Sequence, residues 1–333
     1  MKGKKIIKYV ISLLVAAVLM YFSFRSVDWS AFIEGAKGCN WYFILLAMAA
    51  SIAAFFFRSQ RWRILLQPFD PDMQSITTFN GVNIGYLANF VFPRIGEVVR
   101  CGFISNRSRK NHPDDPEHAV SFDRTLGTVL MSRTCDIAVV FILIAILLAF
   151  HWQQFGNFFT MQMLEPFQAR FNFSLWWVVG AVVLIVAGAL WLIWRMRDRN
   201  EFCRKVCDFC KGVLTGFESI AKMRNAGGFI AYTMLLWAMY SLMSMSVIWA
   251  MPQIQGLGWV DAWFICLVGS VAWMVPVPGG FGAYHGLVAL ALSSIYALDW
   301  DTGLLYATLN HEAQAITMVL CGTVSYIFEI LRK

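Results

Sequence analysis

Long apolar stretches separated by short polar connections make up most of the chain. An α-helix needs about 20 apolar residues to cross the roughly 30 Å hydrocarbon core of a bilayer. Runs that approach or exceed this length occur at 6–24, 41–57, 126–150, 175–194, 229–250 and 302–328. They predict six transmembrane helices and leave no room for a separate water-soluble catalytic domain. We therefore expect residues 1–333 to form one membrane domain.

Two further apolar regions are broken by Gly, Pro, Asn and charged residues. Region 75–105 is too short for two spans and predicts a re-entrant hairpin entering from the cytoplasm. Region 261–298, divided by "PVPGGFG", predicts either a second hairpin from outside or two short spans. Paired broken helices mark substrate sites in transporters, because exposed backbone at membrane depth must be covered by protein or line a cavity. The alternative is ordinary helices kinked at Pro93, Pro276 and Pro278.

The expected fold class is therefore an all-α polytopic membrane protein. It has six to eight transmembrane helices and one or two re-entrant hairpins. Such an arrangement would be like an inverted repeat, although no repeat is evident between the two halves of the sequence.

Composition and charge orient this membrane domain. The chain is 59% hydrophobic and 14% charged, with a net charge of +7. The positive-inside rule assigns both termini to the cytoplasm, together with the basic groups at 2–8, 58–63, 100–124 and 195–224. Bulky residues where a cleavage site would lie favour a retained signal anchor over a cleaved signal peptide. Topology and attraction to anionic lipid explain the net charge, and no nucleic-acid motif is present.

A first charged cluster, Arg94, Glu97 and Arg100, lies in the apolar stretch "NFVFPRIGEVVR". If Pro93 begins a half-helix, the three side chains share one side of it. A charge at bilayer depth costs at least ~2.5 kcal/mol, so such residues usually pair or line a wet cavity. The surplus positive charge suits an anion such as a lipid phosphate, which a guanidinium can bind bidentately. The alternative is an ion network at the cytoplasmic interface that satisfies itself.

A second charged cluster follows in "SFDRTLGTVLMSRTCD", with Asp123, Arg124, Arg133 and Asp136 on one long helix. Arg133 and Asp136 are three residues apart and can pair with each other. Asp123 and Arg124 point to different sides and need partners elsewhere. We expect those partners in the first charged cluster.

A third cluster lies in the last span within "YATLNHEAQAIT" and consists of Asn310, His311, Glu312 and Gln314. A His–Glu pair near the middle of a membrane is a candidate proton relay or ligand site. Helix packing through polar side chains is the alternative. His285, just after "PGGFGAY", joins this cluster if the second hairpin packs on the last helix.

Three cysteines have the spacing of an iron–sulfur motif, but a helical stripe explains them better. Cys203, Cys207 and Cys210 continue an apolar face flanked by Lys and Arg. This pattern predicts an amphipathic helix at the cytoplasmic interface, about 199–224. The loop "HPDDPEH" carries metal-ligating residue types without a defined geometry. We expect no cofactor and no metal.

Four motifs together resemble a known family. The segments "RSQRWRILL", "LANFVFPRIGEVVR", "SFDRTLG…SRTCD" and "PVPGGFGAYHG" occur in this order. They resemble the lysylphosphatidylglycerol-synthase transmembrane region, a flippase-like domain that precedes the synthase in multiple-peptide-resistance factors and also stands alone in bacteria and archaea. The resemblance covers essentially the whole chain, and its P-x-x-G-E-x-x-R element is the most specific part.

The resemblance implies a set of lipid-contacting residues. Its three elements correspond to Pro93, Arg94, Gly96, Glu97 and Arg100; to Asp123 and Arg124; and to Pro278, Gly279, Gly280 and Gly282. The glutamate common in the family after the last element is replaced by His285, which argues against a cationic aminoacyl headgroup. No aminoacyl-transfer domain follows, so we expect no lipid synthesis and no enzymatic activity.

The resemblance and the charged clusters favour one function over two rivals. The favoured function is translocation of a phospholipid between leaflets of the bacterial cytoplasmic (inner) membrane. The lipid is expected to be like phosphatidylglycerol, or another anionic or aminoacylated lipid, and a homo-oligomer is compatible with this function. One rival is a membrane enzyme that acts on a lipid phosphate through Asp123, Glu97 or His311. The other is a non-transporting partner of a separate lipid-modifying enzyme.

Overall fold

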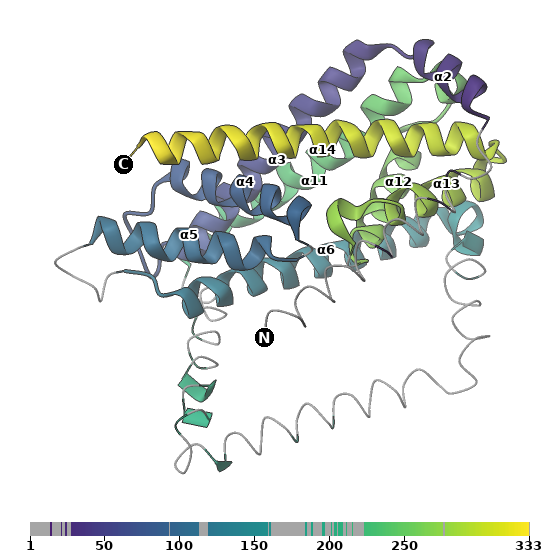
Figure 1. Cartoon of the computed structure of the whole chain (residues 1–333). Coiled ribbons are helices and arrows are strands. Elements are labelled where there is room, and N and C mark those ends of the chain that lie inside the picture. The colour runs from purple at the N-terminus through teal and green to yellow at the C-terminus, as the bar shows by residue number, and fades with distance from the viewer. Residues whose placement is uncertain are drawn as a thin grey trace.

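The fold is built from helices throughout the part of the chain that the computed structural model describes (Figure 1). The structure describes residues 28–92, 94–112, 119–158, 223–275 and 277–332, together with scattered positions between 14 and 24 and between 160 and 215. The helices are α2 (Trp29–Lys37), α3 (Trp41–Leu66), α4 (Ser75–Val91), α5 (Gly96–Asn111), α6 (Phe122–Asn157), α11 (Ala226–Ala250), α12 (Trp259–Ala272), α13 (Ala283–Tyr296) and α14 (Trp300–Leu331).

Among the described residues, four helices are long and apolar enough to cross a membrane: α3, α6, α11 and α14. They coincide with four of the predicted spans, so the protein is a multi-pass, all-α membrane protein. The predicted spans at 6–24 and 175–194 and the predicted interfacial helix at 199–224 lie outside the described residues, apart from single positions. One predicted span was too short: α3 continues to Leu66, so the basic residues after position 57 belong to the same helix.

Polar side chains start several of these helices. Asn40 accepts a hydrogen bond from the backbone N–H of Tyr42 at the start of α3. Asn225 caps α11 through Gly228, at 2.7 Å, and Asp299 caps α14 through Thr302, at 2.8 Å. Each cap satisfies a backbone donor that has no partner within its own helix.

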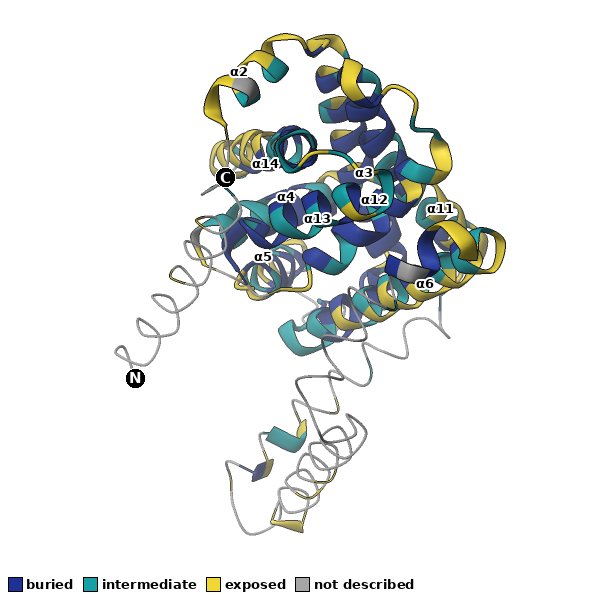
Figure 2. Cartoon of the chain, turned by 90° about the vertical axis from the view of Figure 1, so that its right-hand side faces the viewer, coloured by how far each residue is buried: buried dark blue, intermediate teal, exposed yellow. Residues whose placement is uncertain are grey.

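The core forms where the long helices cross the shorter ones. α3 packs along α11, and α14 packs against α3, α4 and α13. The main apolar core joins residues of α3, α6, α11, α12, α13 and α14. Buried positions therefore gather around α3, α12 and α13, while α6 and α14 turn exposed faces outward (Figure 2).

The two interrupted regions form two helical hairpins. α4 and α5 pack as one pair, α12 and α13 as another, and they approach from opposite ends of α14 (Figure 1). Their bends meet: Arg94 of the first donates a hydrogen bond to the carbonyl oxygen of Met274 in the second, at 2.6 Å. The boundaries of a re-entrant path through the bilayer stay a prediction.

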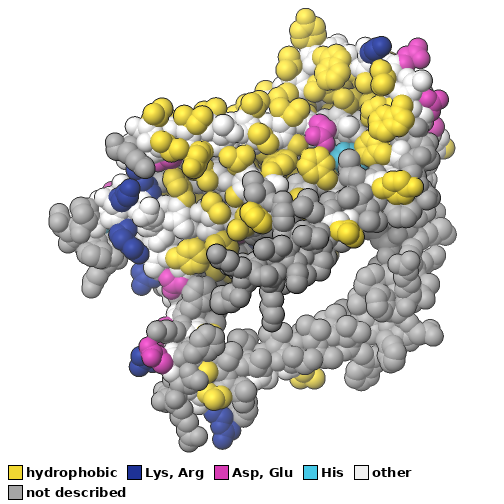
Figure 3. Space-filling view, in the orientation of Figure 1, with side chains coloured by type: hydrophobic (Ala, Val, Ile, Leu, Met, Phe, Trp, Pro, Cys, Tyr) yellow, Lys and Arg dark blue, Asp and Glu magenta, His cyan; other side chains and the backbone are white. Residues whose placement is uncertain are grey.

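The surface of the described helices is apolar along their length and basic at one end (Figure 3). Large apolar side chains such as Phe141, Phe150 and Val324 are exposed on α6 and α14. An exposed apolar surface of this extent marks contact with lipid. Arginines and lysines lie near the C-terminal ends of α5 and α14. These two ends are close together, since Arg107 of α5 lies 4.0 Å from Glu329 of α14.

Candidate functional site

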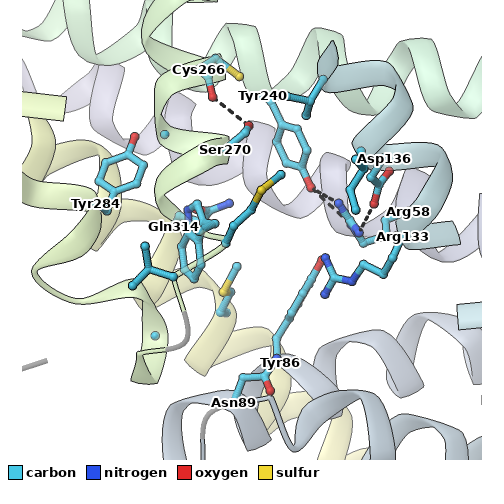
Figure 4. Close-up of a pocket in the computed structure, with 18 of the residues that line it drawn as sticks. Arg58, Tyr86, Asn89, Arg133, Asp136, Tyr240, Cys266, Ser270, Tyr284 and Gln314 are labelled. Atoms are coloured by element: carbon cyan, nitrogen blue, oxygen red, sulfur yellow. Dashed lines mark hydrogen bonds and ion pairs between the residues drawn. The ribbon is translucent and has the colours of Figure 1, made fainter. Parts of the chain in front are cut away.

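A cavity of about 520 Å³ lies where the two hairpin bends meet the long helices. Aromatic and apolar side chains form most of its wall, and polar groups converge on it from several helices (Figure 4). The charged residues that line it are Arg58, Arg94, Glu97, Arg133 and Asp136. A largely apolar cavity with a few convergent polar groups is the usual form of a ligand site.

One ion network ties α3 to α6 at the cavity wall. Arg58 Nη1 lies 3.0 Å from Asp136 Oδ2, and Arg61 Nη2 lies 2.6 Å from Asp136 Oδ1. Arg58 also donates to the hydroxyl of Tyr240 on α11 (Figure 4), and Arg61 donates to Ser132. The two arginines are three residues apart on α3, so one carboxylate can face both of them.

A second ion pair joins α5 to α6. Arg133 Nη2 donates to Glu97 Oε1 at 2.7 Å. The Arg133 side chain is 41% exposed, compared with 10% for Arg58 and 0% for Arg61. Arg133 is therefore the most accessible of the arginines in these ion pairs.

The predicted pairing within α6 was wrong. Arg133 and Asp136 do not pair with each other, because Asp136 faces α3 and Arg133 faces α5. Each residue pairs instead with an oppositely charged side chain on a neighbouring helix.

The first charged cluster is also arranged differently from the prediction. α5 begins at Gly96, and Arg94 precedes it with a left-handed backbone, φ 63°. Arg94 therefore points to the other hairpin and does not share a helix face with Glu97 and Arg100. Arg100 is buried, with its guanidinium 5.1 Å from the ring centre of Trp62.

Asp123 and Arg124 do not join the first cluster. No ion pair links either residue to Arg94, Glu97 or Arg100 in the described part of the chain. Both sit in the first turn of α6, more than two helical turns before Arg133, and the guanidinium of Arg124 lies over Phe69. Glu97 pairs instead with Arg133, which lies further along α6.

The third cluster comes together with His285. His311 Nδ1 lies 3.0 Å from Glu312 Oε1, and His285 Nε2 lies 3.7 Å from the same oxygen. Both imidazoles are almost fully buried, whereas the Glu312 side chain is 36% exposed. Asn310 turns to the cavity wall and donates to the hydroxyl of Tyr306.

The Pro-Gly-Gly element forms the bend before α13. Pro278–Gly280 is one turn of 3-10 helix, and Gly279, Gly280 and Gly282 all have positive φ. Glycine adopts this left-handed backbone without a steric penalty. The turn directs the carbonyl of Gly279 to His311 Nε2, at 2.8 Å. It also places Gly279 at the cavity wall.

Several cavity residues were missed by sequence reasoning. Arg58 at the wall and Arg61 next to it were assigned only to the cytoplasmic side, and Tyr86 and Tyr240 were not selected as site residues. The signal for Arg58 and Arg61 was present, because "RSQRWRILL" repeats basic residues at helical spacing directly after an apolar run. The tyrosines carry no comparable signal, since tyrosine is common in membrane helices.

Comparison with known families gives one decisive match. The family model described as "Lysylphosphatidylglycerol synthase TM region" matches residues 9–322. The chain belongs to this family. The match covers both hairpins and every residue of the cavity, and it indicates a lipid-related function in the membrane. Neither the curated proteins nor the solved structures gave a match.

Proposed function

We propose that the protein moves an anionic phospholipid between the leaflets of the membrane without changing it covalently. The observation that carries this proposal is the cavity at the meeting point of the two hairpin bends, with arginines on an otherwise largely apolar wall. A phospholipid has the same division between a charged phosphate and apolar chains. Family membership supports a lipid substrate.

The charges around the cavity favour an anion. Two carboxylates, Glu97 and Asp136, lie in the wall, and five arginines lie in or next to it: Arg58, Arg61, Arg94, Arg100 and Arg133. The formal excess is three positive charges. A buried or half-buried charge excess is costly in a membrane, and a bound phosphate would offset it through bidentate contacts.

The hairpin bends support transport over simple binding. Irregular backbone at membrane depth is tolerated where it lines a cavity, and transporters place substrates between broken helices that move against each other. The hydrogen bond from Arg94 to Met274 joins the two bends beside the cavity. We propose that separation of the bends opens the cavity to one leaflet, and that the basic end of the molecule faces the cytoplasm of a bacterial cell.

A vesicle assay tests the proposal. The purified protein is reconstituted into vesicles that contain phosphatidylglycerol with a fluorescent acyl chain, and dithionite quenches the label in the outer leaflet. We expect the protein to speed loss of the protected fluorescence over protein-free vesicles. Phosphatidylglycerol should move faster than phosphatidylethanolamine because the site carries excess positive charge. Equal rates with and without protein, for both lipids, would overturn the proposal.

Replacing Arg133 should slow this movement. Arg133→Gln keeps a donor for Glu97 but removes the charge that is most open to the substrate. Hydrogen bonds to charged groups contribute about 1.5–3 kcal/mol, so we expect translocation of phosphatidylglycerol to be slower by roughly 10- to 150-fold. Arg109→Gln, at an exposed position near the end of α5, is the matched control and should leave the rate unchanged. An equal loss in both variants would count against a specific site.

The same vesicles separate the two rival functions. Mass spectrometry of the lipids after the assay detects any covalent change, which a membrane enzyme would produce and a translocase would not. A non-transporting partner of a lipid-modifying enzyme would leave both the rates and the lipids unchanged.

A further inference from the structure

The cluster His285, His311 and Glu312 lies outside the ion networks of the cavity and has the composition of a metal site. One ligand atom from each residue can be chosen so that all three lie within 4.8 Å of one another. Two imidazoles and one carboxylate are a set that binds Zn²⁺ with an open fourth position. Imidazole ligands also suit other divalent transition metals.

The hydrogen bond of His311 fixes which of its nitrogen atoms is free to bind. Its Nε2 lies 2.8 Å from the carbonyl oxygen of Gly279, and a carbonyl only accepts, so Nε2 carries the proton. In the neutral imidazole, Nδ1 is then an unprotonated acceptor, and it faces another acceptor, Glu312 Oε1, at 3.0 Å. Two acceptors at this distance need a cation between them.

The surroundings of His285 favour a metal ion over a proton as that cation. Its side chain is 1% exposed, and neither ring nitrogen has a hydrogen-bond partner among the described residues. A buried polar group without a partner is costly. A proton shared by His311 and Glu312 leaves both nitrogens of His285 unsatisfied, whereas a metal ion uses its Nε2, which already lies 3.7 Å from Glu312 Oε1.

Two of the three ligand separations lie close to those of a tetrahedral ion. Two ligands of one tetrahedral zinc, each about 2.0–2.1 Å from the metal, lie about 3.3–3.5 Å apart. The two measured separations from Glu312 Oε1, 3.0 and 3.7 Å, lie on either side of this range. A rotation of the Glu312 side chain would bring these two separations into the range. The third separation joins the nitrogens of His285 and His311, which lie within 4.8 Å of each other, and the two rings would move closer together on binding an ion.

Aromatic and backbone contacts orient the two imidazoles. Trp273 stacks on His311, with an interplanar angle of 20°, and Phe281 stacks on His285, with an angle of 11°. A backbone carbonyl that accepts from the second nitrogen of a histidine is the usual outer partner of a metal ligand, and Gly279 has this position. Glu312 is 36% exposed, so the described residues do not enclose the cluster completely.

We propose that His285, His311 and Glu312 bind a divalent transition-metal ion, with Zn²⁺ as the best match. His285 belongs to α13, and the other two ligands belong to α14. The ion therefore ties the second hairpin to the last helix, directly behind the Gly279 bend at the cavity wall. This site does not depend on lipid translocation.

Zinc binding to the full-length protein in detergent tests the site. The chain carries an affinity tag without histidine, and Cys203, Cys207 and Cys210 are replaced by serine so that thiolates do not contribute. After EDTA treatment, Zn²⁺ is titrated against a zinc indicator, and metal content is measured by mass spectrometry. We expect one zinc ion per chain. Failure of this chain to take up zinc would overturn the proposal.

Three variants locate the bound ion. Loss of an outer partner alone weakens metal sites by roughly 10- to 100-fold, so His285→Ala, which removes a ligand, should weaken zinc binding by at least that factor. Glu312→Gln, which keeps the size of the side chain, should do the same if His285→Ala does not fold. His151→Ala, on α6 and not a member of the cluster, is the matched control and should bind zinc as the parent chain does. Equal affinity in the parent chain and the Glu312→Gln variant would contradict the assignment.

Cobalt supplies a second readout that does not depend on variants. Co²⁺ in a tetrahedral site of nitrogen and oxygen ligands absorbs visible light far more strongly than hydrated Co²⁺. We expect this absorption in the parent chain and its displacement by Zn²⁺. A spectrum identical to that of hydrated Co²⁺ would rule the site out.

Discussion

Asp136→Ala is expected to lower the free energy of unfolding by about 3–5 kcal/mol, the usual cost of removing one partner from a buried ion pair. Asp136 is the carboxylate that faces both Arg58 and Arg61, and its side chain is 13% exposed. Without it, two guanidinium groups remain in the core without a counter-charge. Unfolding by sodium dodecyl sulfate in mixed micelles, followed by tryptophan fluorescence, measures the change.

Two further variants test the reason for this loss. Asp72→Ala removes a carboxylate that is exposed between α3 and α4, and it should change stability by less than about 0.5 kcal/mol, as surface substitutions usually do. Combining Asp136→Ala with Arg58→Gln should cost less than the sum of the two single changes, because the uncompensated charge is smaller. Strict additivity would show that the two side chains are not coupled.

Gly96→Ala is expected to destabilise the first hairpin by about 3 kcal/mol, the upper end of what overpacking costs. A methyl group at this position would clash directly with the carbonyl oxygen of Gly85 and would lie 2.7 Å from Cγ of Asn89. Asn89 Oδ1 also accepts from the backbone N–H of Gly96, at 2.7 Å. Alanine would therefore push α5 away from α4 and displace the bend that carries Arg94. The same unfolding assay measures the loss.

Gly102→Ala, in the same helix, is the matched control and should have the opposite sign. Apart from the neighbouring residues and the backbone of α5 itself, no atom of the described residues lies within 4 Å of a methyl group added there. Alanine is about 0.8–1.0 kcal/mol more favourable than glycine inside a helix, so this variant should be as stable as wild type or slightly more stable. If both glycine variants lose stability equally, close packing of α4 on α5 is not the cause.

The predictions from sequence agree best with the structure where local hydrophobicity determines which segments form helices. The apolar runs at 41–57, 126–150, 229–250 and 302–328 became α3, α6, α11 and α14, because a run of this length can form a helix without long-range information. The breaks in the two interrupted regions also followed from local chemistry. Gly279, Gly280 and Gly282 adopt positive φ, which other residues rarely do.

The partners of the charged residues could not be predicted in the same way. Helical spacing brought Arg133 and Asp136 together on α6, but the rotation of α6 between α3 and α5 gives each a partner on a different helix. Spacing also placed Arg94 on a helix that begins only at Gly96. His285 was expected to reach His311 only on the condition that the second hairpin packs on α14, and the two rings lie 4.8 Å apart between centres.

The sequence by itself determined that this protein is an all-α membrane protein, where its helices break, and which family it resembles. These properties depend on apolar length, on glycine and proline, and on short motifs, all of which are local. Only the tertiary structure decided that Asp136 joins Arg58 and Arg61, that Glu97 joins Arg133, and that His285 joins His311 and Glu312. Each of these contacts depends on how one helix is rotated against another, and that rotation is set by the packing of the whole bundle.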